Sequence, residues 1–208
     1  MVEEKESLLK DVFGLSKQLG RVPFPIIVKQ STGFDVIPVN LQDSSDKMLI
    51  DNLKGIFRDF LKTSASTRSR YQGDRINEVG RRIEDALVHE MNKQPFTVKK
   101  LPKTGYPDIE ISQSSNRTTY LEMKTSAVQA KSGFRYFYYT NVFKIKSDAR
   151  HLLLNIAVTE ETPRYWKVDN WILSDLSKLS VKLKTEFNAS KDDLMQEKAR
   201  IISSLGPC

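Results

Sequence analysis

The spacing of apolar residues along the first half of the chain predicts mostly helices. Residues 44–62 and 74–92 carry apolar side chains at helical spacing, so each stretch predicts a long helix that buries one face. A similar pattern predicts a helix over residues 3–20, whereas residues 26–39 have a β-rich composition. The polar and basic residues 63–73 predict a connector between the two long helices.

The second half of the chain mixes strand-like and helical patterns. Residues 152–158 are almost all apolar, as expected for a central strand that is covered on both faces. Residues 169–187 and 190–205 are predicted to be helical. Helices that enclose a central mixed sheet are the simplest arrangement of these elements, so the predicted fold class is α/β. The expected strands cover residues 108–111, 118–125, 134–140 and 152–158.

Composition and charge narrow the class of protein. The chain has 208 residues, 39% of them hydrophobic, which is enough for one domain with a buried core over residues 1–208. The formal net charge of +7 is consistent with a polyanionic partner. The lone Cys208 excludes an intrachain disulfide, and the separation of His89 and His151 argues against zinc. Because neither a signal peptide nor a membrane span is recognisable, we expect a protein of a reducing compartment.

Three charged residues are predicted to share one face of a β-hairpin. Side chains alternate between the two faces of a strand, so Glu122 and Lys124 point to the same side. A turn centred on Ser115 would place Asp108 opposite Glu122, with Cβ atoms about 4.5–5.5 Å apart. A register slip of one residue would separate these groups. Glu110 lies on the face of Asp108 and is a further acid of this surface.

The paired acids predict a metal site. Two carboxylates forced together are unfavourable unless a cation joins them. Oxygen ligands without His or Cys favour Mg²⁺ over zinc. A divalent ion held there could neutralise phosphate charge and lower the pKa of a bound water, which Lys124 could orient or deprotonate. The pattern therefore suits phosphate chemistry that needs no covalent nucleophile.

The stretch from Pro107 to Lys124 resembles a known nuclease signature. Pro107-Asp108, with Glu122-Met123-Lys124 beginning fourteen positions after Asp108, resembles the Pro-Asp…(Asp/Glu)-X-Lys motif of the PD-(D/E)XK nuclease superfamily. The preceding helix and the following apolar strand also look like those of these enzymes. The resemblance covers residues 74–160, the expected catalytic core. Residues 1–73 and 161–208 are then expected to add helices, DNA contacts and a dimer surface.

This resemblance implies a restriction-endonuclease-like fold and a role for each residue of the motif. Asp108, Glu122 and the carbonyl of Met123 are implied ligands of Mg²⁺, and Lys124 is implied to act on the attacking water. Glu84 resembles a helix acid that many of these enzymes point at the metal. On a helical wheel Glu84 lies at the edge of the apolar stripe, which favours this role. The alternative is that Glu84 pairs with a basic neighbour on its own helix or is simply solvated.

The resemblance also implies a substrate and an assembly. The size of the chain is most similar to that of type II restriction endonucleases. The expected reaction is Mg²⁺-dependent hydrolysis of double-stranded DNA at a short palindrome, which leaves 5′-phosphate ends. A palindromic target implies a homodimer, and the family implies the prokaryotic cytoplasm. Similarity to the ThaI-like enzymes implies a CGCG target. Two alternatives remain open, a structure-specific or repair nuclease such as a junction resolvase, and a non-catalytic DNA-binding protein with the same fold.

Two segments are candidates for DNA contact. Arg68, Arg70 and Arg75 could clamp phosphates or read guanine edges, and the alternative is a solvated run of charges. In the resembled family, the region after the catalytic lysine often contributes base contacts. The candidates with suitable donors and acceptors there are Gln129, Lys131, Ser132, Arg135 and Asn141.

Overall fold

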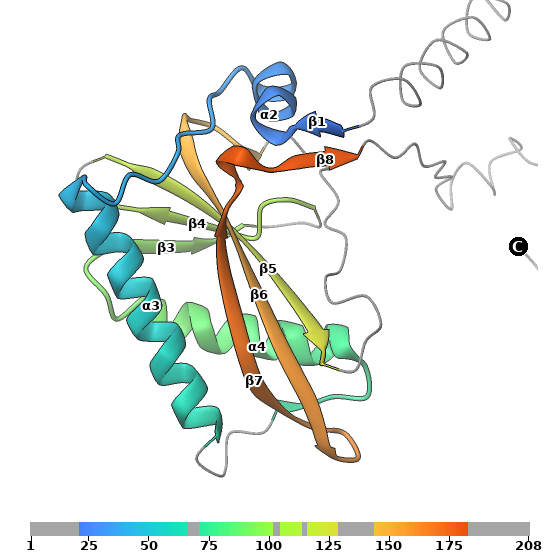
Figure 1. Cartoon of the computed structure of the whole chain (residues 1–208). Helices are drawn as coiled ribbons and strands as arrows, with labels where there is room; N and C mark the ends of the chain where they lie inside the picture. The colour runs from blue at the N-terminus through green and yellow to red at the C-terminus, as the bar shows by residue number, and fades with distance from the viewer. Residues whose placement is uncertain (1–20, 66–70, 102–104, 114–115, 129–143, 183–208) are drawn as a thin grey trace, which may run out of the picture. The chain divides into compact units, whose positions relative to one another are not determined.

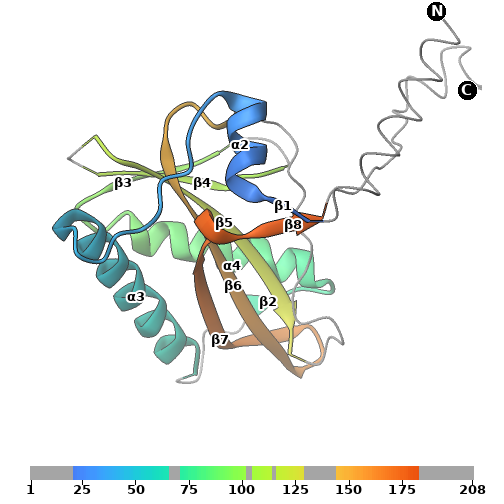
Figure 2. The same cartoon turned by 45° about the horizontal axis from the view of Figure 1, so that its top comes forward.

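The computed structural model describes most of the chain. The described residues are 21–65, 71–101, 105–113, 116–128 and 144–182. The chain divides into two compact units, one of residues 23–180 and one of the two ends, residues 1–22 and 181–208. In the described part of the ends, strand β1 (Arg21–Pro23) pairs with strand β8 (Ser180–Lys182) as a two-stranded sheet (Figures 1 and 2).

Residues 23–180 are built on a six-stranded mixed sheet of order β2-β7-β6-β5-β4-β3 (Figures 1 and 2). Strands β5 and β6 pair in parallel, and the other neighbours pair antiparallel. The predicted mixed α/β fold is thereby confirmed, and it is consistent with a restriction-endonuclease-like core. The predicted elements over 3–20, 134–140 and 190–205 lie outside the described ranges. The elements are α2 (Phe24–Thr32), α3 (Ser44–Ala65), β2 (Tyr71–Gln72), α4 (Ile76–Met91), β3 (Thr97–Lys100), β4 (Ile109–Ser112), β5 (Thr118–Ala127), β6 (Ala149–Thr162), β7 (Tyr165–Asp175) and the 3₁₀ turn η2 (Leu176–Lys178).

Helices α3 and α4 pack on one face of the sheet. Leu53 of α3 and Ile83 of α4 lie in one apolar cluster with Ile109, Leu121 and Leu154 of three neighbouring strands, and all five are fully buried. Because side chains alternate along a strand, the intervening residues face the other side of the sheet. The predicted site acids of the hairpin are among them. Within the described ranges, no helix is both long and apolar enough to cross a membrane.

Helix α2 occupies much of the stretch 26–39, for which the composition predicts strands, and that prediction is wrong there. Pro25 in the first turn has the φ angle that a helix requires, and Gly33 ends the helix with a φ of 82°. Phe24 and Val28 are one helical turn apart, and both are buried. Burial of this pair outweighs the β preference of the branched residues between them.

Strand β7 lies where the sequence predicts a helix over 169–187, so that prediction is wrong for the described part. The strand pairs antiparallel with β6 along its length. A β-bulge leaves Asp169 without a partner residue in β6. The residues packed against the core are therefore Trp166 and Val168 before it, and Trp171 and Leu173 after it. A bulge shifts the alternation of side chains by one residue. The period of two is therefore interrupted in the sequence.

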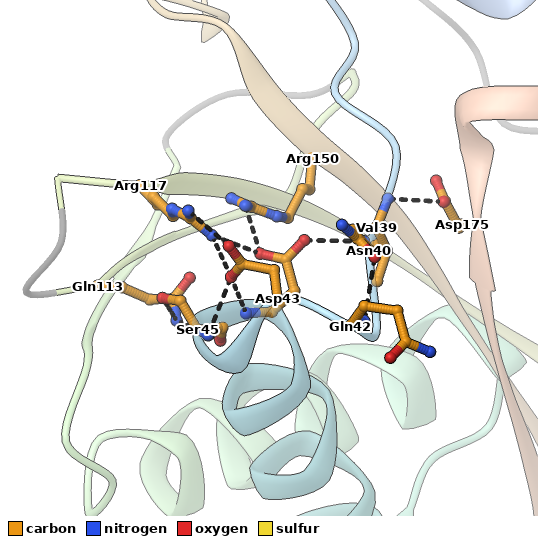
Figure 3. Close-up of polar contacts among 10 residues, drawn as sticks. Val39, Asn40, Gln42, Asp43, Ser45, Gln113, Arg117, Arg150 and Asp175 are labelled. Carbon is orange, nitrogen blue, oxygen red and sulfur yellow. Dashed lines mark hydrogen bonds and ion pairs between the residues drawn. The ribbon is translucent and has the colours of Figure 1, made fainter.

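An ionic network, buried at Asp46 and Arg150, joins the start of α3 to the sheet (Figure 3). The Asp46 side chain is 2% exposed, forms an ion pair with Arg150 of β6 and lies 3.1 Å from Nη1 of Arg117. Two hydrogen bonds from Arg117, at 2.5 and 2.9 Å, hold the pKa of Asp43 at about 2. Asp43 also accepts a hydrogen bond from the N–H of Ser45 at 2.9 Å and so caps α3. The network fixes α3 against the β4–β5 hairpin.

Candidate active site

The β4–β5 hairpin has the register that the sequence predicts. Ile109 pairs with Leu121, and Ile111 pairs with Thr119. Continued by one residue, this register sets Asp108 opposite Glu122. Both residues belong to the face of the sheet that points away from α3 and α4. Their neighbours in sequence, Ile109, Leu121 and Met123, enter the core on the opposite face, against the two helices.

Asp108, Glu122 and Lys124 come together on this face. Asp108 Oδ2 accepts a hydrogen bond of 2.9 Å from the backbone N–H of Met123, which fixes the carboxylate beside β5. The Asp108 carboxylate lies close enough to Glu122 for its charge to act on the pKa of that residue. Nζ of Lys124 forms an ion pair with Oε1 of Glu122. The predicted juxtaposition of two acids and one amine is therefore present.

Glu122 carries a buried carboxyl group in a place that disfavours its charge. Its side chain is 2% exposed. Burial, together with the neighbouring charge of Asp108, raises the pKa of Glu122 from 4.5 to about 7, although Lys124 acts in the opposite direction. Oε2 of Glu122 is buried and has no hydrogen-bond partner among the described residues. An unpaired buried acceptor of this kind is unfavourable, so the site favours a positively charged ligand.

The residues present fit a hard divalent cation. Oε2 of Glu122, to which no described residue donates, and the adjacent Asp108 carboxylate offer oxygen atoms, which Mg²⁺ prefers as ligands. The N–H of Met123 points at Asp108, and the N–H and C=O groups of one residue leave a strand on the same side. The Met123 carbonyl is therefore directed to the same edge of β5. Mg²⁺ commonly binds through one or two carboxylates and keeps several waters, so these oxygen donors are of the type and number that a Mg²⁺ site needs.

Glu84 acts on the site through its charge, which reaches Lys144, but it is paired with another residue. It is 17% exposed in its side chain and forms an ion pair of 2.7 Å with Lys100 of β3. Lys100 also pairs with Asp85 at 2.7 Å, so one amine holds two neighbouring acids of α4. In the described part of the chain, no three acidic, histidine or cysteine side chains converge as a ready metal cluster. The role of Glu84 as a metal ligand stays a prediction.

Lys144 is a second amine at the site, and the sequence pattern did not predict its position there. Its Nζ donates hydrogen bonds to the carbonyls of Gly105, at 2.6 Å, and Pro107, at 2.9 Å. Burial lowers the pKa of Lys144, and the charges of the nearby carboxylates act in the opposite direction. No local pattern marks this lysine, because its partners lie 39 and 37 residues earlier in the chain. The groups whose charges reach it are Asp108, Glu122, Glu84 and Lys124.

A buried aromatic pair supports the residues just before Asp108. The Tyr106 hydroxyl and Nδ1 of His151 are 2.6 Å apart, and the two rings stack with centroids 5.8 Å apart. Both residues are fully buried, and burial lowers the pKa of His151 to about 4. His151 therefore stays neutral at physiological pH, and its role here is to pack against Tyr106.

Of the residues predicted to contact DNA, Arg75 lies within the described ranges. Arg75 is the N-cap residue of α4, and its side chain is exposed, so it is accessible to a large ligand. The other candidates lie outside the described residues, namely Arg68, Arg70, Gln129, Lys131, Ser132, Arg135 and Asn141.

Replacement of the buried carboxyl group is expected to stabilise the metal-free protein. The folded state binds a proton at Glu122 more tightly than the unfolded state, because the pKa is raised from 4.5 to about 7. Stability should therefore fall as the pH rises from 4.5 to 7. By linkage, Glu122→Gln should raise the free energy of unfolding at pH 8 by up to about 3 kcal/mol. Urea unfolding in EDTA at pH 5 and pH 8 measures this effect.

The matched control is Glu110→Gln, which makes the same change on the neighbouring strand at a half-buried position. It should alter the stability at pH 8 much less than Glu122→Gln. Equal effects of the two variants, or a Glu122→Gln variant that loses stability at pH 8, would contradict the assignment of an unfavourable buried charge.

Comparison with known proteins identifies the family. Residues 18–198 match the family model described as the type II restriction enzyme MjaV family. A relative named Type II restriction enzyme MjaV, from Methanocaldococcus jannaschii, is 30% identical over 217 aligned positions, which span 94% of this chain and 93% of the relative. The similarity thus extends far beyond the hairpin that carries the acids. The chain belongs to the MjaV family of type II restriction enzymes.

Proposed function

We propose that this protein is a Mg²⁺-dependent restriction endonuclease of the PD-(D/E)XK type, which hydrolyses double-stranded DNA at a short palindromic site. Membership of the family supports a restriction endonuclease. The observation that carries the proposed chemistry is the buried Oε2 of Glu122, which has no partner within the described ranges. It lies beside the Asp108 carboxylate, with Lys124 on the same face. This arrangement supports the signature that the sequence resembles.

In this proposal each residue of the site has a defined role. Asp108 and Glu122 hold the cation, and the N–H of Met123 keeps Asp108 in place through its hydrogen bond of 2.9 Å. When bound, Mg²⁺ would offset the charge of the scissile phosphate and increase the acidity of water. Lys124 orients the attacking water and donates toward the developing negative charge. The apolar core beneath β5 keeps these groups rigid, because Leu121 is fully buried against α4 and its neighbours.

The remaining parts of the proposal concern the substrate and the assembly. A palindromic site is cut symmetrically when two copies of the chain bind it about a two-fold axis, so we propose a homodimer. The products would carry 5′-phosphate ends. Glu84 would join the cation site if it exchanged Lys100 for the metal, and Arg75 would contact the phosphate backbone.

A digest of a phage genome tests this function directly. With Mg²⁺ the purified protein is expected to cut the genome into discrete fragments, because a site-specific enzyme cuts at the same places in every molecule. EDTA is expected to abolish the cutting but to preserve part of the binding, since phosphate contacts with basic side chains supply much of the affinity. Run-off sequencing of the ends gives the target, including the CGCG site that the ThaI-like resemblance implies, and the position of each cut.

The outcomes separate the alternatives. Cutting that persists in EDTA would overturn the metal assignment. Cutting that is confined to branched DNA would replace the restriction enzyme with a structure-specific nuclease. Binding without cutting under any metal would leave a DNA-binding protein.

A further inference from the structure

We propose that Lys144 is a positioning residue of the nuclease reaction, which holds the segment Gly105–Pro107 so that Asp108 faces Glu122. This inference rests on the proposed function. It concerns a residue outside the Pro-Asp…Glu-X-Lys motif, and no part of that motif predicts it.

The segment before Asp108 depends on Lys144 for its carbonyl hydrogen bonds. Gly105 has a φ of 95°, which is left-handed, and Pro107 has no backbone N–H. The regular pairing of β4 begins only at Ile109. Nζ of Lys144 donates to the carbonyls of Gly105 and Pro107 at 2.6 and 2.9 Å, so a side chain supplies the donors that a neighbouring strand would otherwise supply.

The side chain of Tyr106, which lies between those two carbonyls in sequence, also holds the segment in place. Tyr106 is fully buried, and its hydroxyl lies 2.6 Å from Nδ1 of His151 on β6. Its ring also packs edge-on against Phe24, with centroids 5.6 Å apart. The buried ring fixes the inner side of the segment. The amine of Lys144 fixes its backbone, which leads directly to Asp108.

The positive charge of Lys144 also suits this position, in addition to the hydrogen bonds that its amine donates. Three carboxylates, those of Asp108, Glu122 and Glu84, lie within electrostatic range of the amine. Carboxylates that share a site repel one another, and a fixed ammonium group reduces that repulsion without occupying the cation site. A neutral side chain of similar length could not both donate hydrogen bonds to the two carbonyls and reduce the repulsion between the carboxylates. Loss of Lys144 should therefore let Asp108 move away from Glu122 and weaken the cation site.

Mg²⁺ titrations of the full-length wild type, Lys144→Met and Lys144→Arg test this inference. Groups that orient metal ligands typically contribute about 10- to 100-fold to metal affinity or activity. Lys144→Met is expected to raise the Mg²⁺ concentration for half-maximal cleavage by that factor. Mn²⁺ binding without DNA, followed by electron paramagnetic resonance, should weaken in parallel. Lys144→Arg keeps the charge and the donors, so it should recover most of the wild-type affinity.

Lys146→Met is the matched control, because it removes one positive charge from an exposed residue of the same segment. A merely structural lysine would lower the melting temperature but leave the Mg²⁺ and Mn²⁺ requirements at the values of the control. That result, or no difference between Lys144→Met and Lys146→Met, would overturn the inference. If Lys144→Met does not fold, Lys144→Gln takes its place in the same assays.

Failure of this inference is distinct from failure of the proposed function. A wild-type protein that cuts no DNA with Mg²⁺ would remove both. A wild-type protein that cuts DNA and binds Mn²⁺, with Lys144 variants that match the control in both assays, would remove only the role of Lys144.

Discussion

Asp108→Asn is expected to reduce the rate of double-strand cleavage by on the order of 10³-fold, because the proposed cation would lose one of its two proposed charged ligands beside the reacting phosphate. The change keeps the shape of the side chain and an oxygen that can accept the 2.9 Å hydrogen bond from the N–H of Met123. DNA binding without Mg²⁺ should be as tight as in the wild type or tighter, since a negative charge is removed from a surface that meets phosphates. Binding and catalysis should therefore separate.

Single-turnover cleavage of a plasmid with one target, beside a gel-shift titration in EDTA, measures the two quantities. The control is Asp51→Asn, the same substitution at an exposed residue of α3 that pairs with a neighbour one turn away, Lys47. This control should cleave at the wild-type rate. A rate for Asp108→Asn within about tenfold of the wild type would contradict its role as a ligand, because the expected loss is far larger.

Asp46→Ala is expected to lower the free energy of unfolding by about 3–5 kcal/mol, because it leaves a buried cation without its partner. The Arg150 side chain is 5% exposed, and its Nε already has no partner among the described residues. The N–H of Asn40 would also lose the carboxylate oxygen that it now reaches at 2.9 Å. A loss of this size is a large part of the stability of a typical domain.

Urea unfolding at neutral pH measures this loss, and Asp51→Ala is the control. Asp51 forms an exposed ion pair with Lys47, with both side chains more than half exposed, so its removal should leave the unfolding midpoint nearly unchanged. If Asp46→Ala unfolds at the same urea concentration as this control, the network does not hold α3 against the sheet. Restoration of stability by an apolar replacement of Arg150 in the Asp46→Ala background would support the explanation.

Prediction from the sequence worked best where the contacts are local. The pairing of β4 with β5 depends on residues fewer than twenty positions apart and on strict alternation, so the register could be inferred from a single turn. The long helices α3 and α4 were also predictable, since their apolar stripes repeat at helical spacing. The helix predicted over 169–187 is wrong because a bulge at Asp169 interrupts the alternation that marks β7.

Other features depend on contacts between distant parts of the chain. Helix α2 exists despite its β-branched residues, because it buries Phe24 and Val28. The Phe24 ring packs against Tyr106 and His151, which come much later in the sequence. Glu84 pairs with Lys100, which lies on another element, and a helical wheel cannot show such a partner. Whether an acid at the edge of a stripe meets a metal or a lysine is decided by the packing of α4 on β3.

The sequence by itself determined that Asp108, Glu122 and Lys124 would share one face of a hairpin, because backbone pleating and one short turn impose that arrangement. Only the tertiary structure decided how the site is supported. Strand β6 lies parallel to β5, and this crossover brings His151 beneath Tyr106 and Lys144 against the carbonyls of Gly105 and Pro107. No local pattern encodes these contacts, because they form only when the parallel pair closes and the buried groups find their partners.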